Sequence, residues 1–303
     1  MCAFRQARAP HFLIIGGQRC ATTWLHNAIS RHPAIWTPPI KELHYFDDAP
    51  SLTSRNPASK RRYWKQLKKR VRSSLYRGPY LTHWDFRYFC SLRRDDSWYQ
   101  RLFSDHSKKG LITGESTPAY ATLGEDIFAR IRQLNPELRL IFIMREPISR
   151  SWSGVHHELR KVGIGFGERT LEQKIQRSRC EDVRSRSDYV RTINRLERVF
   201  PREQILYLFF DEVVGDPVGL LKWVMDFIAA PYVDPRELLP ESVKNQRGSM
   251  SHSTPPVEFQ QALAEEYWPI VDELRRRFDG PPSDWAESYE RIMSRSTARA
   301  SGI

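Results

Sequence analysis

A glycine-bearing segment near the amino terminus has the residue types that bind phosphate. It reads Gly16-Gly-Gln-Arg-Cys-Ala-Thr-Thr23 and follows an apolar run that ends at Ile15. A turn of this kind frees backbone N–H groups at the start of the next helix, where the helix dipole also favours negative charge. Arg19 adds a guanidinium, and Thr22 and Thr23 add hydroxyl groups. The Walker sequence G-x-x-x-x-G-K-[ST] is absent, which argues against an ordinary ATP or GTP site with bound magnesium.

A second candidate anion site follows the apolar run at 138–144. Arg145 comes directly after this run, and Ser153 stands one or two turns into the helix expected next. The carboxyl ends of parallel strands are where α/β sheets bind ligands, so these two side chains could converge on a second phosphate. The structural alternative is that Arg145 forms an ion pair with Glu115 or Glu146.

These two segments need a scaffold of alternating strands and helices. Apolar runs predict strands at 11–15, 110–115, 138–144 and 204–210. Helical spacing predicts helices at 22–31, 58–72, 126–134, 147–161, 168–178, 188–199, 216–229 and 256–278, with 41–47 as a loop or short strand. This alternation predicts a three-layer α/β fold with a mostly parallel central sheet, a P-loop-like strand–loop–helix and helices on both faces.

Composition excludes several classes of protein. The chain has 303 residues, 40% of them hydrophobic, which excludes collagenous and disordered proteins. Its four cysteines form no C-x-x-C pair, which fits a reducing compartment. No apolar run is long enough for a secretory signal or a transmembrane segment, so we expect a soluble, cytoplasmic protein.

The charge is strongly positive, with 48 Lys and Arg against 36 Asp and Glu, a net +12. Such a balance suits nucleic acid, an anionic membrane surface or an anionic small molecule. No zinc-finger, basic-zipper or RNA-binding motif is present, so no nucleic-acid partner is expected. The basic run at 60–70 is either a solvated helix face or a contact for an acidic substrate or surface. Aromatic residues at 63, 64, 76, 80, 84 and 88 either line an acceptor cleft or pack in the core.

Several segments in order resemble the sulfotransferases that use 3′-phosphoadenosine 5′-phosphosulfate (PAPS). The branch with heparan sulfate sulfotransferases and many bacterial relatives is the most similar. Residues 16–25 resemble the family's 5′-phosphosulfate loop, and residues 140–153 resemble its 3′-phosphate segment. The other similar segments are 41–47, 114–120, 200–212 and 245–249.

The resemblance implies transfer of a sulfuryl group from PAPS to a hydroxyl or amine of a small molecule or glycan, with no metal. The product would be adenosine 3′,5′-bisphosphate. Arg145 and Ser153 would hold the 3′-phosphate, and Arg247 would be a further anion contact. Arg19 would also stabilise charge on the bridging oxygen in the transition state. The implied donor loop comprises Gly17, Gln18, Arg19, Cys20, Ala21, Thr22, Thr23 and Trp24.

The acceptor side is less closely matched. Glu42 stands at the position of the general base in the heparan-type branch, and His44 is the competing base because its ordinary pKa lies near 6.5. Ser116 occupies a position that is Lys in those enzymes, which removes one cation from the acceptor side. Residues 48–97 form a longer insertion than those enzymes carry, and we expect an acceptor-side or lid region there. The whole of 1–303, with this insertion, is expected to be a single sulfotransferase domain ending in a basic tail at 286–303.

Two other functions fit the same residues. A nucleotide kinase would keep the strand–loop–helix and use ATP, and it would require magnesium. A non-catalytic module would use the basic surface to bind nucleic acid or another anion. Nothing in the sequence indicates an oligomeric state.

Overall fold

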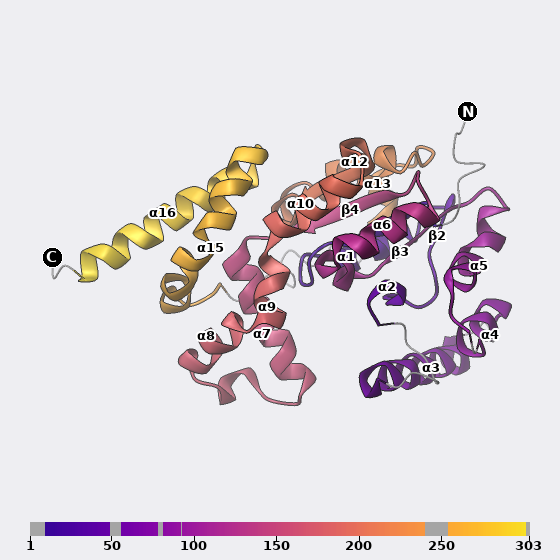
Figure 1. The fold of residues 1–303 in the computed structure, drawn as a ribbon, viewed down its shortest axis with the longest axis horizontal. Helices are drawn as coiled ribbons and strands as arrows, with labels where there is room; N and C mark the ends of the chain where they lie inside the picture. Colours follow the sequence, from indigo (N-terminus) through magenta and orange to yellow (C-terminus); the bar gives the residue numbers. More distant parts are fainter. Residues whose placement is uncertain (1–9, 49–55, 78–80, 92, 240–253, 301–303) are drawn as a thin grey trace.

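The structure is a computed structural model that describes residues 10–48, 56–77, 81–91, 93–239 and 254–300. Its centre is a five-stranded sheet in the order β2-β3-β1-β4-β5, and every neighbouring pair is parallel (Figure 1). The strands are β1 Phe12–Ile14, β2 Ile35–Trp36, β3 Ile112–Ser116, β4 Arg139–Met144 and β5 Ile205–Phe209.

The α-helices connect these strands and extend beyond them. They are α1 Thr22–Ile29, α2 Tyr45–Asp48, α3 Pro57–Arg77, α4 His83–Phe89, α5 Asp96–Ser107, α6 Glu125–Leu134, α7 Pro147–Lys161, α8 Leu171–Arg179, α9 Glu181–Arg184, α10 Tyr189–Val199, α11 Phe210–Gly215, α12 Pro217–Phe227, α13 Pro235–Leu238, α15 Val257–Arg277 and α16 Pro281–Ala300. Short 3₁₀ helices are η2 Pro118–Thr122, η3 Phe166–Glu168, η4 Ser185–Ser187 and η5 Arg202–Gln204.

Helices cover both faces of the sheet because successive strand side chains point to opposite sides. Leu13 of β1 packs in a core with residues of α5, α6, α10 and α15. Phe12 and Ile14 pack in a second core with residues of α1 and α12. The expected three-layer α/β architecture is confirmed, and the sheet is parallel throughout.

The expected elements are present, with ends shifted by up to three residues, except that α3 extends five residues beyond the expected end at 72. Three other features differ. The edge strand β2 was not predicted, since two residues are too few to show a pattern. The segment at 41–47 is a loop only through His44, and helix α2 begins at Tyr45. Much of the basic tail at 286–303 belongs to helix α16, which packs along α15. None of the helices in the described ranges is both long and apolar enough to cross a membrane.

The region expected as an insertion, 48–97, contains α3, α4 and the start of α5. These helices gather at the opposite end of the molecule from α15 and α16 (Figure 1). Tyr63, Trp84 and Tyr88 are buried among them, which supports core packing, whereas Trp64 is 47% exposed. The side chain at 76 and residue 80 lie outside the described residues.

Candidate functional site

The segment between β1 and α1 leaves the sheet along the neighbouring strand β4. Gly17 donates its N–H to the carbonyl oxygen of Ile143 at 3.1 Å. A Cβ on Gly16 would lie 2.8 Å from the backbone nitrogen of Ile143, closer than real side chains approach. Only glycine therefore lets the loop pass this close to β4.

We expect Gly16→Ala to lower the free energy of unfolding by about 1–3 kcal/mol, because the added carbon must push the loop away from β4. Gly167→Ala is the matched control, since no atom lies within 4 Å of its added carbon. Denaturant unfolding of the two variants measures the difference. Equal stability of both variants would show that the loop is not constrained here.

The start of α1 is shaped to receive an anion. Arg19 and Ala21 have positive φ angles of 75° and 63°. Ala21 is the N-cap of α1, and no side chain caps the helix there. The N–H groups of the first turn thus lack a side-chain acceptor in the described part of the chain, and the helix dipole adds positive potential.

Left-handed backbone is concentrated at the candidate residues. Five described non-glycine residues have positive φ, and four of them are Arg19, Ala21, Glu42 and His44. Such conformations cost free energy and persist where the surroundings hold them, often at functional sites.

The structure places Arg145 and Ser153 on either side of Arg19, and each of them contacts it. The Nε of Arg19 donates to the Oγ of Ser153 at 2.9 Å. Arg145 is 8% exposed, and its Nη1 donates to the carbonyl oxygen of Arg19 at 3.3 Å. Its guanidinium also lies 4.3 Å from the ring centre of Phe210. The end of β1 and the start of α7 therefore form one cationic cluster.

No ion pair of Arg145 with Glu115 or Glu146 is found among the described residues. Glu146 instead caps α7, accepting from the backbone N–H groups of Ile148 and Ser149. Glu115 accepts hydrogen bonds from the side chains of Tyr99 in α5, Tyr120 in η2 and Thr117, which lies between β3 and η2. The structural alternative for Arg145 is therefore not supported.

The like charges of this cluster repel one another. Burial, and then the neighbouring Arg160 and Arg145, lower the pKa of the Arg19 guanidinium. Burial likewise lowers the pKa of Arg145. A bound anion would offset both the desolvation and the repulsion, so the residues present fit a phosphate or sulfate group.

Tyr189, which the sequence did not single out, links the two anion-binding segments. It is 1% exposed, and its hydroxyl accepts from the backbone N–H of Arg145 at 3.3 Å. The same hydroxyl lies 3.8 Å from the Sγ of Cys20. Burial raises the pKa of the Cys20 thiol to about 11, so the thiol is neutral at physiological pH. Tyr189 thus fixes the spacing between the donor loop and Arg145.

The remaining loop residues differ in exposure. Gly17, Cys20, Thr22 and Trp24 are buried, Gln18, Arg19 and Ala21 are half-buried, and Thr23 is exposed. Arg247 lies outside the described residues. Ser116, at the end of β3, is fully buried, and its Oγ has no hydrogen-bond partner among the described residues. No group of three His, Cys, Asp or Glu side chains in those same ranges is arranged to hold a metal ion.

The second cluster lies beside the end of β3 and contains both candidate bases. Nε2 of His44 lies 3.5 Å from Oε2 of Glu42, and its Nδ1 lies 2.6 Å from Oδ2 of Asp47. Nζ of Lys41 lies 3.2 Å from Oε1 of Glu42. The imidazole is 9% exposed and the Glu42 carboxylate 40% exposed, so Glu42 is the member that solvent or a substrate can reach.

The charges of this cluster are mutually stabilised. Burial favours a higher pKa for Glu42, but the hydrogen bond from His44 and the charge of Lys41 outweigh it and lower the pKa to about 2. Burial favours a lower pKa for His44, but the hydrogen bonds to Asp47 and Glu42 raise it to about 8. At pH 7 the pair is therefore a carboxylate and an imidazolium.

Buried Glu115 holds the segment that carries this cluster. Its carboxylate accepts from the backbone N–H of Leu43 at 3.4 Å and from Tyr120 Oη at 3.1 Å. Tyr120 in turn accepts from the backbone N–H of Tyr45 at 2.8 Å. The backbone N–H of Glu42 donates to the carbonyl oxygen of Ser116 at 3.1 Å. These bonds fix the loop on either side of His44 to the end of β3.

The raised pKa of His44 makes stability depend on pH. The folded protein holds this proton more tightly than the unfolded chain. The contribution of His44 to the free energy of unfolding is therefore complete below about pH 6.5 and is lost as pH rises through 8. We expect His44→Asn to cost about 2 kcal/mol more at pH 6 than at pH 9. Denaturant unfolding of wild type and variant at both pH values measures this. The same cost at both would show that His44 is not held protonated.

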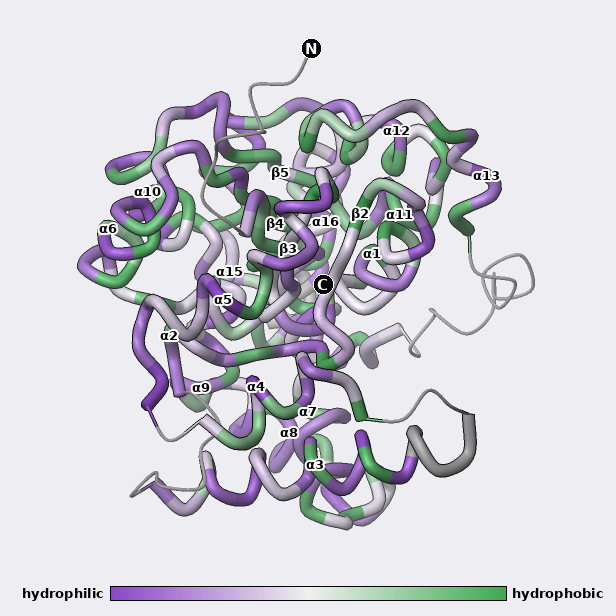
Figure 2. The backbone as a smooth tube through the Cα atoms, turned by 90° about the vertical axis from the view of Figure 1, so that its right-hand side faces the viewer, coloured by the Kyte–Doolittle hydropathy of each residue, from purple (hydrophilic) through white to green (hydrophobic). Residues whose placement is uncertain are grey.

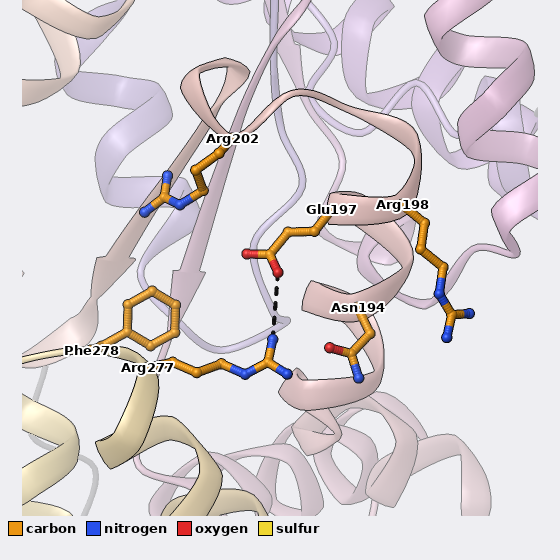
Figure 3. A pocket seen from close by; sticks show the side chains of 6 residues that line it. All are labelled: Asn194, Glu197, Arg198, Arg202, Arg277 and Phe278. Carbon is orange, nitrogen blue, oxygen red and sulfur yellow. Dashed lines mark hydrogen bonds and ion pairs between the residues drawn. The ribbon is translucent and has the colours of Figure 1, made fainter.

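A cavity of about 640 Å³ lies at the other end of the sheet, beside the start of β5 (Figure 3). Its lining residues are Asn194, Glu197, Arg198, Arg202, Arg277 and Phe278. Arg277 is paired with Glu197 at 3.5 Å, and Arg198 is paired with Glu125 at 3.3 Å. The third cation, Arg202, donates to the carbonyl oxygen of Ile205 at 2.7 Å. Two of the three cations thus already have carboxylate partners, and the cavity is not the candidate site.

Comparison with known proteins decides the family. Residues 10–234 match the model of the sulfotransferase family. The chain belongs to the sulfotransferase family. This confirms the resemblance seen in the sequence, and the donor loop and Arg145 segment both lie within the matched residues.

Similar proteins include enzymes and structures from several organisms. Heparan sulfate glucosamine 3-O-sulfotransferase 3B1 of Mus musculus is 30% identical over 136 residues, 44% of this chain and 34% of that protein. Heparan sulfate glucosamine 3-O-sulfotransferase 5 of Homo sapiens is 22% identical over 235 residues, 73% and 54% of the two chains. This sulfotransferase thus spans a third to about half the length of these relatives.

Two solved structures share its fold. The sulfotransferase from Alicyclobacillus acidocaldarius has a TM-score of 0.59 at 21% identity, covering 91% of this chain and 98% of that one. The sulfotransferase domain of the Synechococcus PCC 7002 olefin synthase has a TM-score of 0.52 at 15% identity, covering 90% and 96%. At these identities the likeness supports the fold alone.

Proposed function

We propose that this sulfotransferase transfers a sulfuryl group from PAPS to a hydroxyl or amine of a small molecule or glycan. The observation that carries the proposal is the junction of Arg19, Ser153 and Arg145 at the adjacent ends of β1 and β4. This junction offers cations and N–H donors from two segments, as a nucleotide with two separated anionic groups requires.

Each segment is assigned one part of the donor. The first turn of α1, with Arg19, Thr22 and Thr23, binds the 5′-phosphate and the sulfuryl group. Arg145 and Ser153 bind the 3′-phosphate. PAPS supplies an activated sulfuryl group when bound, and Arg19 stabilises the negative charge that builds on the bridging oxygen as the sulfur–oxygen bond breaks. Arg stays protonated, so it acts by charge and not by donating a proton.

Glu42 is the proposed general base. It is ionised and half-exposed, whereas His44 is protonated and has both ring nitrogens directed at carboxylates. His44 therefore has no lone pair to offer at pH 7 and instead positions Glu42. A carboxylate of low pKa is a weak base, but the acceptor oxygen becomes strongly acidic as it bonds to sulfur, so the proton can move late in the step.

The residues on the acceptor side indicate the class of substrate and not a particular molecule. The two mammalian relatives described above are, by their names, sulfotransferases of heparan sulfate glucosamine. Here Ser116 stands where that branch has Lys, and α3–α5 form the neighbouring region. We therefore propose a hydroxyl or amine acceptor without naming heparan sulfate. No metal and no nucleic acid has a role in this proposal.

Turnover with labelled PAPS and a panel of alcohols, phenols, amines and glycans tests the function, with EDTA present throughout. Transfer of label in EDTA is the expected result. Phosphoryl transfer from ATP that requires magnesium would instead favour a kinase. Absence of both activities, together with salt-sensitive DNA binding, would favour a binding module.

A further inference from the structure

Helix α3 carries a concentration of positive charge with no acidic residue in its 21-residue sequence. Figure 2 shows hydrophilic residues along most of its length, interrupted by a few hydrophobic ones. The exposed cations are Lys60, Arg61, Lys65, Lys68, Lys69 and Arg72. None of them has a carboxylate partner within 4.0 Å in the described part of the chain, unlike Arg62 and Arg70, which pair with Asp48 and Asp85.

Two apolar side chains lie among these cations. Trp64 is 47% exposed and Val71 is 36% exposed. They are seven residues apart, so they lie within about 20° of each other around the helix. Lys68 lies about 40° from Trp64, and half-buried Leu67 lies on the other side of the pair. The outer surface of α3 is therefore an apolar stripe bordered by cations.

This outer surface points away from the candidate active site. On the inner side of α3, Tyr63 is buried, and Gln66 donates from Nε2 to the carbonyl oxygen of Glu42 at 3.2 Å. Position 66 lies about 160° from Trp64 around the helix. The stripe is thus separated from Glu42 by the width of α3, about 10 Å, and is not part of the donor or base clusters.

We propose that the outer surface of α3 binds an anionic lipid bilayer. Lys and Arg side chains are attracted to acidic headgroups, and exposed Trp and Val gain by entering the boundary between headgroups and acyl chains. A free polyanion such as a nucleic acid would use the cations but would leave the apolar stripe in water. The stripe between the cations therefore favours a bilayer. A membrane on this side would lie about one helix width from Glu42.

Sedimentation of the protein with vesicles tests the proposal. We expect binding to vesicles of 70% phosphatidylcholine and 30% phosphatidylglycerol, and none to pure phosphatidylcholine. The triple variant Lys65→Glu, Lys68→Glu and Arg72→Glu should lose on the order of a hundredfold in affinity. The matched control reverses three exposed cations elsewhere, Lys108→Glu, Lys109→Glu and Arg169→Glu, and should bind as wild type does.

A substitution in the apolar stripe distinguishes binding to a bilayer from binding to a soluble polyanion. Trp64→Ala should weaken vesicle binding about tenfold, whereas Trp223→Ala, which removes another exposed Trp, should not. Circular dichroism of every variant confirms that it is folded, and none of the substituted residues belongs to the site. No binding to the anionic vesicles would overturn the proposal. Undiminished binding by Trp64→Ala, with displacement by heparin or duplex DNA, would overturn it in favour of a soluble polyanion.

Discussion

Glu42→Gln should lower kcat by roughly 10²–10⁴-fold and leave the affinity for adenosine 3′,5′-bisphosphate unchanged. The amide keeps the size of the side chain but cannot take the acceptor proton. Glu42 belongs to the cluster beside β3, whereas the donor groups lie beside β1 and β4, so the loss should fall on turnover alone. Steady-state kinetics and calorimetric titration with the bisphosphate measure the two quantities.

The matched control for this prediction is Glu203→Gln, a carboxylate exposed in η5 before β5. It should turn over as wild type does. Full activity in Glu42→Gln would remove Glu42 as the base. If His44→Asn then abolished turnover with the bisphosphate still bound, the base would be His44.

Arg145→Ala should weaken the bisphosphate about a hundredfold or more, because it removes a buried cation from a charge-assisted contact. Its effect on AMP should be small, since AMP has no 3′-phosphate. The ratio of the two dissociation constants therefore measures how much Arg145 contributes to binding the 3′-phosphate. Calorimetric titration of both nucleotides provides it.

Arg202→Ala removes a cation from the remote cavity of Figure 3 and serves as the control. It should change neither dissociation constant. An equal loss of AMP and bisphosphate in Arg145→Ala would mean that Arg145 supports the whole loop and does not contact the 3′-phosphate.

The sequence was sufficient for most of the fold because the long apolar runs are buried strands. Residues 138–144 are apolar except Arg139, and β4 lies there inside the sheet, between β1 and β5. The two-residue strand β2 leaves no such pattern. Helix α2 was missed because four residues are too few to show helical spacing.

The candidate site was predictable in its parts but not in its connections. Gly16 and Arg19 stand out by type and position, whereas Tyr189 meets Cys20 across 169 residues of sequence. The sequence indicated only that Glu115 belongs to a strand. Its contacts with Leu43 and Tyr120 show that it also anchors the loop beside Glu42. Contacts of this kind depend on the packing of distant segments, which periodicity does not encode.

The proposed function requires that the donor site recognises a 3′-phosphate. Thermal unfolding with adenosine 3′,5′-bisphosphate and, separately, with AMP tests it most directly. At 100 times its dissociation constant a ligand adds about 2.7 kcal/mol, which raises the midpoint by roughly 5 °C in a protein of this size. We expect that rise with the bisphosphate and little change with AMP. No rise at millimolar bisphosphate, or an equal rise with AMP, would show that the donor site does not recognise a 3′-phosphate.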